Sequence, residues 1–262
     1  MGALVDPEDH VCINVALYGR VGHRWAMTER GRQSLQRTAR SFQVGPSQLS
    51  YDGQCFMLRF DEVQCPWPRK LQGTVRVHPR AFTQFETTLD DWGRHRWGPI
   101  APCSRVEVDL PQVGLRWSGQ GYLDSNSGDE PIHVPFRSWD WSRAVLPDGR
   151  TAVIYDVQQR QGPGHVVSRL FDANGRDEPL EAPARVQLPR TAWGIRRHVH
   201  SDTGFVPRVS EVFEDTPFYV RDVVSTSLLG HRVTSVHETL DTNRLVSWPV
   251  QLMLPFRMPR RA

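Results

Sequence analysis

The chain has 262 residues, and its 32 Lys and Arg residues against 29 Asp and Glu leave a formal net charge of only +3. This charge is far below that of a dedicated nucleic-acid-binding protein and argues against nucleic acid as a partner. The length suffices for two β domains that each bury a core. The N-terminal sequence MGALVDPEDH does not have the pattern of a signal peptide, and no run of 18 uncharged apolar residues occurs. We therefore expect an intracellular protein that does not span a membrane.

Short extended segments separated by turn residues follow one another along the chain. Alternating and β-branched residues predict a hairpin from residues 11–18 and 24–29, joined by a glycine-containing turn. Residues 30–42 are compatible with a short helix, although they lack an apolar stripe. Further strands are expected at residues 48–51, 55–63, 71–77, 82–89, 104–110, 151–158, 165–172, 185–188, 193–200, 208–214, 218–229 and 232–240. The turn sequences LPDGR and DANGR predict tight hairpins. The pattern as a whole indicates an all-β barrel or sandwich.

The residues that commonly bind metals are scattered in this sequence. Its cysteines form no CxxC pair and no tight group with histidine, and we expect them to be reduced thiols: Cys12, Cys55, Cys65 and Cys103. One HxHxD string, His198, His200 and Asp202, has the residue types of a metal site, but no second group of ligands accompanies it. We expect no metal.

The central stretch, residues 95–155, holds most of the residues with useful chemistry. Three pairs are spaced two residues apart: His95 with Trp97, Tyr122 with Asp124, and Trp139 with Trp141. Because successive side chains of a strand point to opposite faces, each pair shares a face if its segment is extended. Large aromatic residues that share a face with titratable groups are typical of a barrel interior or of a cleft between sheets.

The motifs GRHRWGPIAP, GYLDSN, GDEP and SWDWSRA, with DPEDHVCINVALYG, RWAMTERGR and EDTPFY, resemble the carotenoid 1,2-hydratase family, also called hydroxyneurosporene synthase. The resemblance runs from about residue 6 to the C-terminal LPFRMPRRA. It implies addition of water to the terminal C1=C2 bond of acyclic carotenoids such as neurosporene and lycopene, without a cofactor. It also implies a cytoplasmic protein at the surface of the inner or photosynthetic membrane.

The fold implied by this resemblance is all-β, with two tandem lipocalin-like β-barrels at residues 1–134 and 135–262. The segment SWDWSRAVLPDGRTAVIYDV would form the opening hairpin of the second barrel. A matching tryptophan-rich segment is expected before VCINVALYG and is absent. We therefore expect the first barrel to lack its opening strands because of a truncated N-terminus, and residues 11–18 to form an exposed edge.

The resemblance also assigns roles to residues of the central stretch. Hydration of an alkene needs an acid, a surface that stabilises a cation, and an oriented water. Asp124 is the candidate acid if burial raises its pKa. The aromatic faces of Trp97 and Tyr122 suit cation stabilisation. His95 is a candidate for holding or deprotonating the attacking water, or for relaying the proton that recharges the acid.

Three further aromatic residues are candidates for binding the polyene substrate, namely Trp139, Trp141 and Tyr155. Asp156 is a reserve acid if its strand directs it inward. Without the resemblance, each of these residues also has an ordinary structural explanation. Aromatic residues commonly fill a core, and an aspartate such as Asp124 commonly stabilises a turn.

Two functions from different classes therefore remain open. The first is a carotenoid hydratase, and the second is a non-catalytic lipocalin-like carrier of a long apolar isoprenoid. Both require an apolar binding site, whereas only the enzyme requires a buried acid within it. A third possibility is cyclase-like chemistry on another isoprenoid or terpenoid, because protonation of an alkene would also begin a cyclisation.

Overall fold

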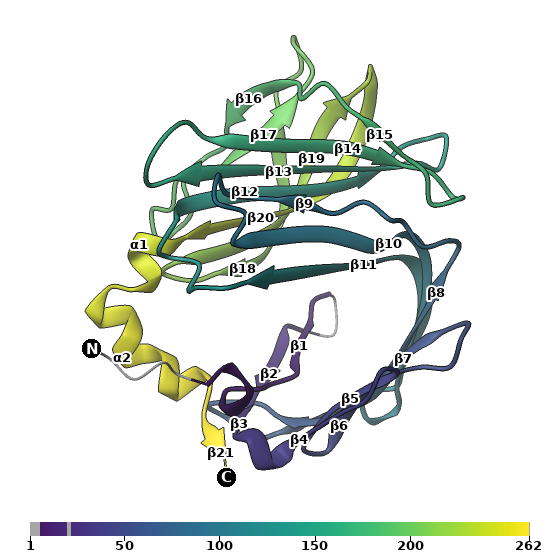
Figure 1. The fold of residues 1–262 in the computed structure, drawn as a ribbon, viewed down its shortest axis with the longest axis vertical. Coiled ribbons are helices and arrows are strands. Elements are labelled where there is room, and N and C mark those ends of the chain that lie inside the picture. Colours follow the sequence, from purple (N-terminus) through teal and green to yellow (C-terminus); the bar gives the residue numbers. More distant parts are fainter. Residues whose placement is uncertain (1–5, 20–21, 262) are drawn as a thin grey trace. The chain divides into compact units, whose positions relative to one another are not determined.

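The structure is a computed structural model that describes residues 6–19 and 22–261, and most of these residues lie in β-strands (Figure 1). The chain forms two compact units. The first comprises Met1–Pro79, Ser104–Gly121 and Gln251–Ala262, and the second comprises Arg80–Cys103 and Tyr122–Val250. The all-β class expected from the sequence is confirmed. The domain boundary expected between residues 134 and 135 stays a prediction.

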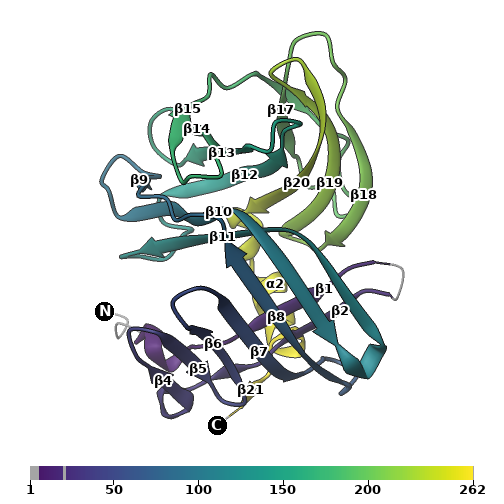
Figure 2. The same cartoon turned by 90° about the vertical axis from the view of Figure 1, so that its right-hand side faces the viewer.

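The first unit is built mainly from antiparallel hairpins. Its strands are β1 (Asn14–Leu17), β2 (Arg24–Met27), β3 (Glu29–Arg30), β4 (Leu35–Arg37), β5 (Ser41–Val44), β6 (Ser47–Tyr51), β7 (Phe56–Val63), β8 (Lys70–Pro79) and β21 (Arg260–Arg261). Three short 3-10 helices accompany them: η1 (Pro7–Asp9), η2 (Arg32–Ser34) and η3 (Pro111–Val113). Strands β4 to β8 lie side by side in sequence order, as Figure 2 shows. Strands β10 (His95–Leu110) and β11 (Leu115–Gly128) contribute residues to both units.

The predicted N-terminal hairpin is present, because β1 pairs antiparallel with β2. Part of its turn, residues 20 and 21, lies outside the described residues. Within the described chain, β1 has no second strand neighbour. The short helix considered at residues 30–42 is wrong, since these residues form η2, β4 and β5. They have no apolar stripe for a helix to bury, and Leu35 instead pairs with Val44 across an antiparallel hairpin.

The second unit is organised on a seven-stranded antiparallel sheet with the order β15-β14-β13-β12-β20-β19-β18. The bounds of these strands are β12 (Phe136–Val145), β13 (Thr151–Gln159), β14 (His165–Phe171), β15 (Asp177–Pro179), β18 (Arg208–Asp215), β19 (Tyr219–Leu228) and β20 (His231–Asp241). Two further strands, β16 (Ala184–Gln187) and β17 (His198–Ser201), form a separate antiparallel pair, and β9 (Thr87–Thr88) pairs with β10. Figure 2 shows the strong curvature of β18, β19 and β20. The hairpins predicted at LPDGR and DANGR join β12 to β13 and β14 to β15.

Three expected strand boundaries are wrong. Residues 82–89 form a strand only at Thr87–Thr88. The segment before this strand makes side-chain contacts instead, and the centroid of the Phe85 ring lies 6.1 Å from that of the Trp97 ring. Residues 193–200 form a strand only from His198, since a turn with Gly194 at a positive φ of 75° precedes it. Strand β10 begins at His95 and not at residue 104, so the HRWGPIAP part of GRHRWGPIAP belongs to a strand.

Two helices near the C-terminus were not predicted from the sequence: α1 (Thr242–Leu245) and α2 (Trp248–Arg257). Asp241 caps α1, its side chain accepting a hydrogen bond from the backbone N–H of Arg244. Among the described helices, none is both long enough and apolar enough to cross a membrane.

The core of the first unit contains a buried ion pair beside its apolar residues. Glu62 is fully buried, and its carboxylate accepts hydrogen bonds from both terminal nitrogens of Arg30, at 2.9 and 3.2 Å, and from Ser47 Oγ at 2.6 Å. Apolar residues of the core include Ala26, Phe60 and Leu71. A buried charge that loses its partner retains the full cost of desolvation, so this pair makes the unit sensitive to single substitutions.

We expect Arg30→Met to destabilise the protein by about 3–5 kcal/mol, because it leaves the Glu62 carboxylate buried without a cation. Arg32→Met is the matched control. Arg32 pairs with Asp6 at the surface, its side chain is 58% exposed, and the expected loss is below about 1 kcal/mol. Urea unfolding of both variants measures the difference. Equal midpoints would contradict a structural role for the buried pair.

Candidate active site

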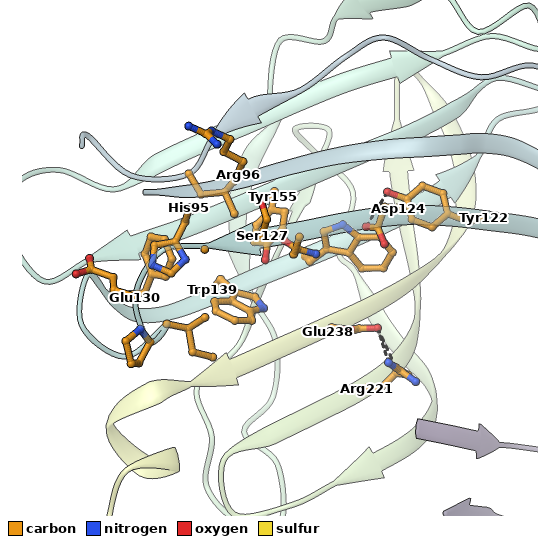
Figure 3. A pocket seen from close by; sticks show the side chains of 17 residues that line it. His95, Arg96, Tyr122, Asp124, Ser127, Glu130, Trp139, Tyr155, Arg221 and Glu238 are labelled. Carbon is orange, nitrogen blue, oxygen red and sulfur yellow. Dashed lines mark hydrogen bonds and ion pairs between the residues drawn. The ribbon is translucent and has the colours of Figure 1, made fainter. Parts of the chain in front are cut away.

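The second unit contains a cavity of about 630 Å³. Six of the seven residues singled out from the sequence line it: His95, Tyr122, Asp124, Trp139, Trp141 and Tyr155. The lining also includes Phe136, Glu130, Arg221 and Glu238 (Figure 3). The three pairs of residues spaced two apart lie in strands: His95 with Trp97 in β10, Tyr122 with Asp124 in β11, and Trp139 with Trp141 in β12. The two side chains of each pair therefore lie on one face of their strand.

The seventh residue, Trp97, lies behind the cavity wall and holds the carboxyl group of Asp124. Trp97 is fully buried, and its indole N–H donates a hydrogen bond to Asp124 Oδ2 at 2.9 Å. The hydroxyl of Tyr122 donates to the same oxygen at 3.1 Å. Two neutral donors on adjacent strands thus orient one carboxyl group at the cavity surface.

Burial raises the pKa of Asp124 above its ordinary value, although the hydrogen bonds from Trp97 and Tyr122 lower it in part. Burial also raises the pKa of Tyr122, and the neighbouring Asp124 charge adds to this effect. The pKa of Tyr155 is raised as well, by burial first and then by the charges of Asp124 and Glu238. Both tyrosines therefore keep their protons, and Asp124 is protonated to a greater extent than an exposed aspartate at the same pH.

His95 lies at the other end of the cavity, beside Glu130, as Figure 3 shows. Its ring packs edge-on against Phe136 at 4.9 Å, and its backbone N–H donates to Asp90 Oδ1 at 2.8 Å. A side chain at Gly128 would place its Cβ 2.6 Å from His95 Nδ1, so only glycine fits there. Asp124 precedes Gly128 by four residues of β11, which is roughly 13 Å of strand. The structure therefore brings Trp97, Tyr122 and Asp124 together but does not bring His95 to them.

A continuous series of aromatic rings connects the two ends. Phe136 lies 6.2 Å from Trp139, Trp139 lies 6.1 Å from Tyr155, and Tyr155 lies 5.6 Å from Trp97, all as centroid distances with tilted or edge-on rings. These rings and the side chain of Trp141 give the cavity an apolar, electron-rich wall. Such a wall binds apolar molecules and stabilises a cation that forms within about 6 Å of a ring face. The carboxyl group of Asp124 can protonate an alkene that is bound against this wall.

Sequence reasoning missed charged residues that line the cavity, such as Glu238, Arg221 and Glu130. Arg221 contacts Glu238 Oε1 through Nε and Nη2, both at 2.9 Å, and Arg94 contacts Glu130 at 2.9 Å. The register explains why Glu238 and Arg221 reach the cavity: Tyr155, Trp141, Glu238 and Arg221 are directly opposed on β13, β12, β20 and β19. The spacing within each strand was readable from the sequence, but the pairing between distant strands was not.

The reserve acid Asp156 points away from the cavity, because it follows Tyr155 in β13 and so lies on the opposite face of the sheet. Its Oδ2 contacts His200 Nε2 at 3.0 Å and Arg185 Nε at 2.8 Å. Asp140, which separates Trp139 from Trp141, contacts Arg185 and His198 on that same face. The alternation of β12 and β13 thus separates an aromatic cavity wall from a layer of ion pairs.

Two members of the HxHxD string belong to this layer. His198 and His200 contact Asp140 and Asp156, and Asp202 accepts hydrogen bonds from Ser227 Oγ and the backbone N–H of Gly230. In the part of the chain that the structure describes, no group of three or more His, Cys, Asp or Glu side chains is arranged to hold a metal ion. All four cysteines are unpaired.

Comparison with known proteins gives one family for nearly the whole chain. The model of the family described as carotenoid hydratase CrtC matches residues 2–262. The chain is 54% identical over 257 residues to the acyclic carotenoid 1,2-hydratase of Rubrivivax gelatinosus, and 50% identical over 256 residues to that of Thiocapsa roseopersicina. These matches cover 98% and 97% of the chain, which spans 63% of the length of each of these two relatives. The acyclic carotenoid 1,2-hydratase of Cereibacter sphaeroides is 37% identical, over 98% of the chain and 91% of its own length.

The pair of His200 and Asp156 makes stability depend on pH. Burial alone would lower the pKa of His200, but its hydrogen bonds to Asp156 and to the Pro183 carbonyl outweigh burial and raise it. Burial alone would raise the pKa of Asp156, but the hydrogen bond from His200 and the charge of Arg185 outweigh burial and lower it.

The stabilisation from His200 is therefore complete below the unfolded pKa of about 6.5 and is lost as pH rises through the higher folded pKa. The contribution of Asp156 is present above its unfolded pKa of about 3.9 and is lost as pH falls through the lower folded pKa. The pair stabilises most between about pH 4 and 6.5. We expect His200→Gln to lower the melting temperature more at pH 6 than at pH 9. A constant difference across this range, measured by thermal unfolding, would contradict this linkage.

Proposed function

Because the chain belongs to the carotenoid hydratase CrtC family, we propose that it adds water to the terminal C1=C2 double bond of an acyclic carotenoid such as neurosporene or lycopene. The observation that carries this proposal is the carboxyl group of Asp124. It is held by two neutral donors, has a raised pKa, and faces a cavity walled by aromatic rings. Hydration of an isolated alkene requires an acid in such an apolar environment.

The proposed reaction begins when protonated Asp124 donates its proton to C2 of the substrate. The π electrons of the double bond form the new C–H bond, and the positive charge develops on the tertiary carbon C1. Trp97 and Tyr122 keep the carboxyl group in place, and the hydrogen bonds that they donate stabilise the carboxylate that forms. The face of Tyr122 and those of the other aromatic residues that line the cavity attract the cation by up to about 2 kcal/mol.

The apolar end of the substrate would bind along Trp139, Trp141 and Tyr155, which line the cavity wall. We assign His95, at the far end of the same cavity, the relay of a proton through water within the cavity to recharge Asp124. The reaction changes no oxidation state overall, because a proton and a hydroxide equivalent add to one bond. An acid, a base and water are sufficient for it, and we propose that no cofactor takes part.

A carrier of a long apolar isoprenoid would need the aromatic wall but no acid. The three relatives named above are hydratases by name, and the partly buried carboxyl group of Asp124 has no purpose in a carrier. The hydratase is therefore favoured over the carrier.

We further propose that the sheets of the two units are variants of a tandem lipocalin-like architecture, with its boundary near residues 134 and 135. The β12–β13 hairpin, which contains SWDWSRAVLPDGRTAVIYDV, supports this view because it occupies the predicted opening position of the second repeat. In the described residues, the hydrogen-bonded order of each large sheet is open.

We propose that the protein acts at the cytoplasmic surface of the inner or photosynthetic membrane, where an acyclic carotenoid is dissolved. Helix α2 supports this proposal. Trp248, Leu252 and Phe256 are spaced four residues apart, so they share one helix face, and they are 75%, 61% and 75% exposed. An exposed apolar helix face of this kind inserts into the boundary between lipid headgroups and acyl chains.

Asp124→Asn tests the proposed acid, because it keeps the shape of the side chain and removes the proton. We expect hydration of lycopene to fall about 100-fold to 10,000-fold. Trp97→Phe should cost less than Trp97→Ala, which loses packing as well as the hydrogen bond. Product analysis in deuterated water should find one new carbon-bound deuterium, at C2. A folded Asp124→Asn protein with nearly full activity would show that Asp124 is not the acid.

Replacing Leu252 and Phe256 together by serine should weaken binding to anionic lipid vesicles at least about tenfold, because two apolar side chains no longer enter the bilayer. Val206→Ser is the control, since Val206 is 72% exposed but lies in a loop outside α2. Vesicle co-sedimentation measures both. Equal binding of the double variant and the control would contradict the assignment of α2.

A further inference from the structure

We propose that Glu238 is a second catalytic residue, which binds the water that attacks the substrate cation and accepts a proton from it. Asp124 would then be the acid of the reaction and Glu238 its base. This inference rests on the proposed hydratase function and adds to it the residue that activates water.

The first argument is position. Glu238 lines the same cavity as Asp124, from a different strand (Figure 3). It stands directly opposite Trp141 across β20 and β12, and Trp141 stands directly opposite Tyr155 across β12 and β13. Tyr122, which holds Asp124, packs on Trp141 with 5.6 Å between ring centroids. Tyr122, which holds the acid group, and Glu238 therefore both lie against Trp141.

The second argument is the difference between the two carboxyl environments. The hydrogen-bond partners of Asp124 are neutral groups, the Trp97 indole and the Tyr122 hydroxyl. Glu238 is instead bound by a guanidinium group, through two nitrogens of Arg221 at 2.9 Å from Oε1. Pairs of carboxyl groups in contrasting environments are the usual arrangement of an acid and a base in one site.

The third argument is a donor next to Glu238. The indole N–H of Trp141 is buried and has no hydrogen-bond partner among the described residues. A buried donor of this kind is normally satisfied, in many cases by water. A water that accepts a hydrogen bond from Trp141 and donates one to Glu238 would be held beside the aromatic wall where the cation forms.

The other acidic residue of the cavity is less suited to this role. Glu130 pairs with Arg94 and lies beside His95, at the end of the cavity away from Asp124 (Figure 3). The side chain of Glu238 is 24% exposed, so it is accessible to water without being a surface residue.

The proposed step is balanced. After Asp124 has protonated C2, a lone pair of the water forms the bond to C1. One O–H bond of that water breaks, and its proton passes to Glu238, which leaves the neutral tertiary alcohol. The proton then returns from Glu238 to the Asp124 carboxylate through water in the cavity, by the relay proposed for His95, and both residues regain their starting states.

The test uses the full chain and compares Glu238→Gln, Glu238→Asp and Glu178→Gln with the unchanged protein, with lycopene as substrate. Glu178 is the control, because it is exposed on β15, pairs with Arg150 and does not line the cavity. We expect Glu238→Gln to lower kcat about 100-fold with little change in KM, and Glu178→Gln to leave both unchanged.

The pH profile of kcat/KM separates a base from a structural partner of Arg221. Charged and titratable groups that face Glu238 are Arg221 and Tyr219 on β19 and Tyr155 on β13, and Asp124 on β11 lines the same cavity. A general base in the site should give the rate of the unchanged protein a decline on the acid side of its pH profile. Glu238→Gln should lose this limb, and Glu238→Asp should keep it at a reduced rate. A purely structural role would lower the melting temperature and leave the limb in place.

Full activity or an intact acid limb in Glu238→Gln would overturn the inference while leaving the hydratase function standing. If Glu238→Gln does not fold, Glu238→Asp decides, because an unchanged kcat in that variant also overturns it. Absence of hydration by the unchanged protein would contradict the proposed function, and the assignment of Glu238 would be withdrawn with it.

Discussion

The second unit depends on one geometric constraint, the two-residue period of side chains in its antiparallel sheet. In β12, Trp139 and Trp141 line the cavity while Asp140 between them points to the other face. In β13 the same alternation separates Tyr155 from Asp156. A shift of one residue in either pairing would exchange the two faces and place charged groups against the aromatic wall. The register of β12 with its two neighbours therefore determines which side of the sheet can carry the chemistry.

This separation of faces lets the unit bury a layer of charged groups behind the aromatic wall. Carboxylates of this layer have cationic or hydrogen-bonding partners, such as Arg197 for Asp222 and Thr239 for Asp140. Because these carboxylates have partners, their burial is tolerated, and the contacts of the layer join β17 to β12 and β20. On the cavity face, by contrast, Asp124 has only neutral donors. That difference in partners gives the two faces different chemistry within one sheet.

The aromatic series through Phe136, Trp139 and Tyr155 has two consequences. It provides an apolar surface within the cavity, and it separates His95 from the carboxyl group of Asp124. The charged pair of Glu238 and Arg221 lies at the same wall, one strand beyond Trp141. The cavity thus combines a carboxyl group held by neutral donors, an aromatic surface and a water-accessible carboxylate, which are the groups that the proposed addition of water to an alkene uses.

The sequence by itself determined the all-β class, most hairpins and the pairing of functional residues on shared faces, because these follow from side-chain alternation and turn chemistry within short segments. It also pointed to six of the residues that line the cavity. The tertiary structure decided what depends on contacts between distant segments. Strand pairing brought Glu238 and Arg221 to the wall and placed His95 at the far end from Asp124. Spacing along one strand carries no information about which other strand lies beside it, so these outcomes were not readable from the chain alone.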